Sequence, residues 1–104
     1  LNFEGKNGVL EFNGGNYALI EMSDLSIGNE LSIEFWSKGN AIGGTNSTFL
    51  EAYDTLNNRI VNIHMPWSNN NMYFDAGISS GYDRINKTMT SAEMDNSWNH
   101  WAFR

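Results

Sequence analysis

Alternation of apolar and polar residues at a period of two is the feature of this sequence that most restricts its fold. Leu31, Ile33 and Phe35 form one such series, with polar residues between them. A period of two puts apolar side chains on one face of a β-strand, whereas a helix needs a period of about 3.6. Similar runs cover residues 1–3, 9–12, 18–22, 31–38, 49–54, 60–65, 72–76 and 98–103. The pattern predicts an all-β domain.

The segments between these runs are rich in turn-forming residues. The chain has ten glycines and sixteen asparagines, and several of them cluster at 13–16, 57–58 and 69–71. Both residue types tolerate the left-handed backbone conformation that tight turns need. Only Thr90 and Glu93 indicate a helix, because their spacing is that of a capping box. We expect about one helical turn there, since Asp95 and Asn96 follow closely.

The composition argues against several classes of protein. A net charge of −6, with only six Lys and Arg residues, is unfavourable for binding nucleic acid. The chain has no Cys and therefore neither disulfides nor a thiolate metal site. No apolar run approaches the roughly 20 residues that a membrane-spanning helix needs. We expect one globular domain over residues 1–104, or part of a larger one.

Several of these runs resemble the laminin-G-like domains of the concanavalin A-like lectin family. Residues 1–5 and 9–12 are similar to the opening hairpin of that family, and residues 31–38 to its long central strand. Residues 97–103 contain the pattern W-x-H-x-A, and residues 59–67 resemble a bacterial subgroup. The resemblance implies a two-sheet antiparallel β-sandwich with jelly-roll topology.

The resemblance also implies that residues 1–104 are the N-terminal part of a larger domain. In the family, the strand at 98–103 lies near the middle, and later strands pair between the earlier ones. The fold would then be incomplete at the C-terminus. Unpaired strand edges favour association, and we expect these residues alone to self-associate or to fold loosely.

Aromatic and basic residues in the second half of the chain are the candidate ligand-binding residues. Trp67, Tyr73 and Tyr82 offer flat rings on which a sugar can stack. Tyr82, Asp83 and Arg84 place a ring, a carboxylate and a guanidinium together, and either a local Asp–Arg pair that holds a loop or a ligand contact would explain them. We assign Trp67, Tyr73, Tyr82 and Arg84 to the candidate site.

The other large aromatic and imidazole side chains are expected in the interior. Trp36, Trp98 and Trp101 lie within alternating runs and are predicted to be core residues. His64 and His100 lie in predicted strands as well. Two histidines without further ligands at suitable spacing favour packing over metal binding.

A calcium ion is the one cofactor that we consider. Asp75 and Asp83 flank the loop at 77–81, and carboxylates beside loops are typical calcium ligands. The resemblance adds to this, because members of the family often hold a structural calcium. Glu4 and Asn7, however, stand where the opening hairpin of the family tends to carry Asp. The alternative is that both carboxylates cap turns.

Catalysis is not expected. Glycoside hydrolases with a jelly roll carry closely spaced acidic residues on one strand, and here Glu34 stands alone. The resemblance favours a non-catalytic binding or adhesion module, extracellular or on a bacterial cell surface, that binds a glycan first or another extracellular protein. One alternative is a structural protomer of an extracellular layer, filament or sheath that contacts copies of itself. The other is the remnant of a jelly-roll glycoside hydrolase.

The all-β prediction is tested by far-UV circular dichroism of the purified protein. We expect a β-sheet spectrum with almost no helical signal. A helical content above about one-third, the typical share in globular proteins, would contradict the sandwich.

Overall fold

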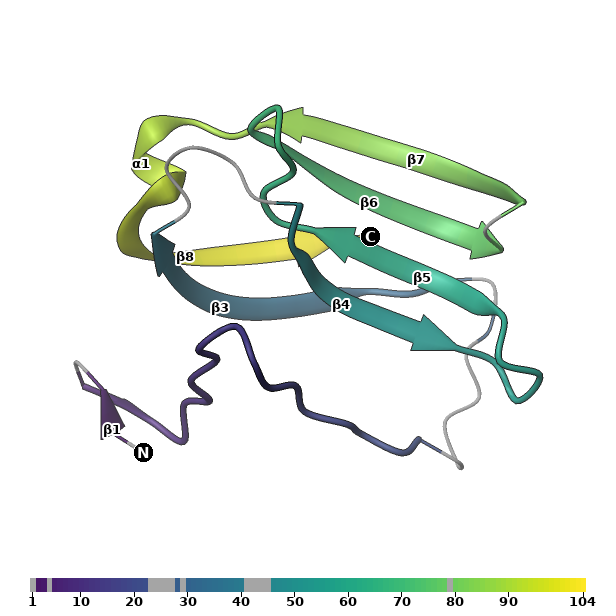
Figure 1. Ribbon diagram of the computed structural model, residues 1–104, viewed down its shortest axis with the longest axis horizontal. Coiled ribbons are helices and arrows are strands. Elements are labelled where there is room, and N and C mark those ends of the chain that lie inside the picture. Colours follow the sequence, from purple (N-terminus) through teal and green to yellow (C-terminus); the bar gives the residue numbers. More distant parts are fainter. Residues whose placement is uncertain (1, 4, 23–27, 29, 41–45, 79) are drawn as a thin grey trace.

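The computed structural model describes residues 2–3, 5–22, 28, 30–40, 46–78 and 80–104, and the chain forms two antiparallel sheets (Figure 1). The larger sheet has the order β4-β5-β6-β7 and the smaller one pairs β3 with β8. A short hairpin of β1 and β2 precedes them. The bounds are β1 Asn2–Phe3, β2 Lys6–Asn7, β3 Ile33–Asn40, β4 Thr48–Tyr53, β5 Arg59–His64, β6 Asn71–Ile78, β7 Gly81–Thr88 and β8 Asp95–Phe103.

Apolar side chains from the two sheets meet to form the core. Ile63 of β5 is fully buried, and Phe74 of β6 lies 5.4 Å from Phe103 of β8 between ring centroids. Phe35 of β3 stacks between Phe103 at 5.8 Å and Phe49 at 4.1 Å. Aromatic pairs at such distances stabilise a core beyond the area that they bury. The fold is therefore an all-β, sandwich-like arrangement of two sheets, as the alternation predicted.

The predicted helical turn is present as α1, Ser91–Met94. The carboxylate of Glu93 accepts hydrogen bonds from the backbone N–H of Thr90 at 2.7 Å and from its hydroxyl at 2.9 Å. Lys87 donates to both oxygens of the same carboxylate at 2.6 Å. These bonds, that of Lys87 foremost, lower the pKa of Glu93. Met94 is buried and anchors the turn to the core.

The N-terminal part differs from the prediction. Residues 9–12 and 18–22 form no strand, and the opening hairpin is limited to the two short strands β1 and β2. Alternation alone does not make a strand, because its backbone groups also need a partner across a ladder. No described residue pairs with 9–22. Leu1, Glu4 and residues 23–27 and 41–45 of the predicted segments lie outside the described residues.

The structure also contains one strand that the sequence did not predict. β7 has exposed side chains throughout, so it lacks the apolar alternation that identifies a half-buried strand. Its ladder with β6 runs without a break from Asn71–Thr88 to Ile78–Gly81. Pairing with a well-packed neighbour, rather than its own hydrophobicity, makes this segment a strand.

The tryptophans that were predicted as core residues lie on both faces of the smaller sheet. Trp101 is buried and donates from Nε1 to Ser37 Oγ at 3.1 Å, whereas Trp98 is only partly buried. The prediction that Trp36 is a core residue is wrong. Trp36 pairs with His100 on the opposite face of β3 and β8, where its ring contacts the imidazole in a tilted arrangement, with centroids 5.1 Å apart.

Substitution of the two tryptophans measures this difference. Trp101 is 7% exposed and Trp36 is 54% exposed. We expect Trp101→Ala to lower the free energy of unfolding by about 3–5 kcal/mol, the usual cost of a large core truncation. The matched control Trp36→Ala should lose about 1 kcal/mol or less. Urea denaturation followed by circular dichroism gives both values, and equal losses would contradict the assignment of faces.

Candidate functional site

Four polar residues stand in register across the larger sheet. Glu51 of β4 is opposite Asn62 of β5, Asn62 is opposite Asp75 of β6, and Asp75 is opposite Arg84 of β7. Cross-strand partners point to the same side of a sheet, and neighbours along a strand point to opposite sides. Because Ile63 faces the core, these four side chains lie on the other side. We call them the polar row.

An ion pair lies at the centre of the polar row. Arg84 donates from Nε to Asp75 Oδ1 at 2.6 Å and from Nη2 to Asp75 Oδ2 at 2.8 Å. This bidentate geometry is the strongest that an arginine and a carboxylate form. Asp75 is only 1% exposed, so its charge depends on Arg84 for compensation. The same hydrogen bonds raise the pKa of Arg84.

Two tyrosine rings lie on either side of this ion pair. The guanidinium carbon of Arg84 is 4.4 Å from the ring centroid of Tyr73 and 5.0 Å from that of Tyr82. Cations over aromatic faces at these distances are attracted by the ring quadrupole. Arg84 is therefore held by its salt bridge and by two rings, and it presents a fixed planar group on the sheet surface.

Asparagine side chains orient Tyr73. Its hydroxyl accepts hydrogen bonds from Nδ2 of Asn69 at 2.7 Å and from Nδ2 of Asn71 at 3.3 Å. These bonds lower the pKa of Tyr73, that of Asn69 most. Asn69 lies in the turn between β5 and β6, where Asn70 adopts the left-handed conformation with a φ of 60°. The asparagine cluster thus makes a turn, as expected, and also fixes a ring of the site.

A second group of side chains adjoins the polar row at the end of β5. Asn62 is fully buried and donates from Nδ2 to His64 Nε2 at 2.6 Å. With Nε2 as an acceptor, the ring proton of His64 is on Nδ1 and is donated to Thr48 Oγ1 at 3.3 Å. The ring of Trp67 contacts that of His64 in a tilted arrangement, with centroids 4.4 Å apart. Oδ1 of Asn62 has no partner, which is unusual for a buried amide oxygen.

The structure brings most of the predicted ligand-binding residues together. Arg84 contacts the rings of both Tyr73 and Tyr82, and Trp67 joins the same face through His64. The interpretation of Asp83 and Arg84 as a local pair is not supported. Adjacent residues of a strand point to opposite faces, and Arg84 pairs across the ladder with Asp75 instead.

The two carboxylates considered for calcium are not brought together. Asp75 is engaged by Arg84 on the outer face, whereas Asp83 is opposite Ala76 and points to the other side of the sheet. Among the described residues, no three His, Asp or Glu side chains form a group that could hold a metal ion. Calcium binding through Asp75 or Asp83 stays a prediction from the resemblance alone.

Several contributors to this face were not predicted as site residues, among them Glu51, Asn62 and Asn69. Glu51 accepts a hydrogen bond from the hydroxyl of Tyr53 at 2.9 Å, which raises the pKa of that phenol. Asn62 is a polar residue between apolar ones in β5, a pattern that indicates only the outer face of a strand. Its contact with His64, two residues further on, is the one signal in the sequence that would have marked it.

Comparison of the chain with protein-family models, with characterised proteins and with solved structures found no significant match. In the described part of the chain, no helix has the length and hydropathy that crossing a membrane requires. The site must therefore be interpreted from its own geometry.

Breaking the central ion pair should destabilise the protein. Arg84→Met leaves the buried Asp75 carboxylate without its partner, and we expect a loss of about 2–4 kcal/mol, discounted because part of the guanidinium is exposed. The double variant Asp75→Leu/Arg84→Met removes both charges and should lose less than the single variant. Urea denaturation of the wild type, the single variants Arg84→Met and Asp75→Leu and the double variant measures this, and additive losses would show that the pair is not coupled.

Proposed function

We propose that this protein is a non-catalytic binding module that holds a carbohydrate on the outer face of the larger sheet. The observation that carries the proposal is the arrangement of Arg84, fixed by Asp75, between the rings of Tyr73 and Tyr82. Sugars combine apolar C–H faces with many hydroxyls. A site with oriented rings and a few fixed polar groups suits such ligands.

The chemistry of this face supports binding rather than hydrolysis. A glycoside hydrolase needs one carboxylic acid to donate a proton and a second carboxylate at a defined separation. Asp75 is buried and bound on both oxygens by Arg84, and Glu51 accepts a hydrogen bond from Tyr53. Carboxylates engaged in this way act as structural acceptors. The proposal therefore assigns no catalytic residue.

The resemblance to laminin-G-like and concanavalin A-like domains belongs to the same proposal. The two segments that resemble central strands of that family form β3 and β8, and they pair with each other from Ile33–Phe103 to Lys38–Trp98. Pairing of these strands within a two-sheet fold is what the resemblance would require. Jelly-roll topology and an extracellular or bacterial surface location are further parts of this proposal.

A second candidate function is that of a structural protomer that contacts copies of itself. Residues 9–22 favour it, because they form no strand and yet carry large apolar side chains that are mostly exposed. These side chains are Leu10, Phe12, Leu19, Ile20 and Met22. Large exposed apolar surfaces of soluble proteins often mark sites of protein–protein interaction.

A glycan array with the purified protein tests the carbohydrate proposal. We expect Tyr82→Ala to weaken binding about tenfold or more, equivalent to about 1.4 kcal/mol, through loss of a stacking face. Trp67→Ala should weaken binding as well. The matched control is Tyr17→Ala, which removes a ring that is exposed in the segment 9–22.

Unchanged melting temperatures in Tyr82→Ala and Tyr17→Ala would show that both variants are folded. Equal affinities of the wild-type protein and the folded Tyr82→Ala variant would refute the placement of the site. Absence of any glycan affinity in the wild-type protein would refute carbohydrate as the ligand class.

A further inference from the structure

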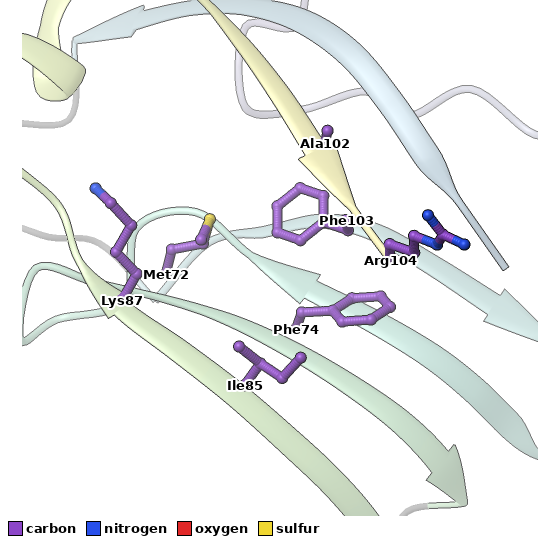
Figure 2. A pocket seen from close by; sticks show the side chains of 7 residues that line it. All are labelled: Met72, Phe74, Ile85, Lys87, Ala102, Phe103 and Arg104. Carbon is purple, nitrogen blue, oxygen red and sulfur yellow. The ribbon is translucent and has the colours of Figure 1, made fainter. Parts of the chain in front are cut away.

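An apolar groove lies between the inner face of the larger sheet and the end of β8 (Figure 2). Its volume is about 270 Å³. The apolar side chains of Met72, Phe74, Ile85 and Phe103 gather at its centre, and Lys87 and Arg104 lie toward its two ends. The groove is on the opposite side of β6 and β7 from the polar row, because Ile85 and Arg84 are neighbours in one strand.

The groove lacks a covering strand in the described part of the chain. Ile85 is opposite Phe74 in the ladder, yet Phe74 is buried and Ile85 is 60% exposed. In the described residues, β8 pairs with β3 alone, so its other edge presents a row of backbone donors and acceptors beside the groove. An extended segment with apolar residues on one face satisfies both features, since it adds to the edge and fills the groove.

Residues 9–22 have the properties that this groove requires. They belong to no sheet, and their large apolar side chains are exposed. Apolar residues alternate with others over 10–12 and 18–22, on either side of the turn at 13–16. Their only charged residues are Glu11 and Glu21. Glu21 complements Arg104 at one end of the groove, whereas Lys87 at the other end is already paired with Glu93.

The segment does not fill the groove of its own chain. None of its residues lines the groove, and Figure 1 shows the dark purple and blue trace of this segment beyond β3 and β4, at the opposite end of the molecule from β7. In a second copy, the same segment is not held at this distance from the groove, so a second copy can supply it.

We propose that residues 18–22 of one copy add as a strand to the edge of β8 beside the groove in a second copy and cover its apolar side chains. Ile20 and Met22 enter the groove, and Glu21 faces Arg104. Mutual exchange gives a closed dimer, and one-way addition gives an open chain. This inference is independent of the carbohydrate proposal, because it uses the opposite face of β6 and β7.

Sedimentation velocity over a range of protein concentrations tests the proposal. We expect the wild-type protein to form dimers or longer assemblies with rising concentration. Ile20→Asp alters the segment and Ile85→Asp alters the groove, and each should weaken assembly at least tenfold. Arg104→Glu should weaken it too, through repulsion of the acidic segment. The control Leu56→Asp puts the same charge on the turn between β4 and β5, where Leu56 is 81% exposed, and should assemble as the wild type does.

A mixture of two variants gives the sharpest result. Ile20→Asp retains an intact groove and Ile85→Asp retains an intact segment, so together they can form one complete contact. We expect mixed assemblies from this pair but not from either variant alone. Wild-type protein that remains monomeric at every concentration would overturn the proposal, as would assembly that persists in both variants. Glycan binding measured on the same variants reports separately on the carbohydrate proposal.

Discussion

The ion pair between Asp75 and Arg84 determines how the larger sheet is completed. β6 is buried on both faces, because Phe74 enters the core and the carboxylate of Asp75 is buried on the other side. A buried carboxylate is costly unless a cation and hydrogen bonds compensate it. Arg84 is the cation of β7 on that face, because Lys87, opposite Met72, points to the other side. A slip of one residue would turn Arg84 to the wrong face, so the ion pair fixes the register of a strand that has little apolar packing of its own.

The sequence predicted those strands in which apolar and polar side chains alternate. Apolar residues alternate with others along β3, β5, β6 and β8, and Ile63, Phe74 and Phe103 are buried as that pattern requires. β7 was missed because exposure on both faces leaves no periodic signal. The expected strands at 9–12 and 18–22 show the reverse error, since their side-chain pattern is correct but no described ladder receives them. Pairing is a non-local property that a local pattern does not contain.

The aromatic rings of the candidate site were predictable from the sequence, whereas the ion pair at its centre was not. Tyr82 and Arg84 were chosen because they are close in sequence, and they do meet Tyr73 on one face. Their partner Asp75 was interpreted as a calcium ligand, because its pairing depends on the register of a strand that was not predicted. Asn62 is still harder to recognise. Its neighbours across the ladder, Glu51 and Asp75, become visible only once the strands are aligned.

The two faces of β6 and β7 carry surfaces of opposite character. One presents a charged group held between tyrosine rings, and the other presents apolar side chains without a covering strand. Because the side-chain period of a strand is two, neither surface can extend into the other. An assembly built through the groove would therefore leave the partly exposed Arg84 and its tyrosine rings uncovered in every copy. Copies joined in this way would present several identical sites, and weak binding at each site would add up to strong attachment to a surface that repeats the same ligand.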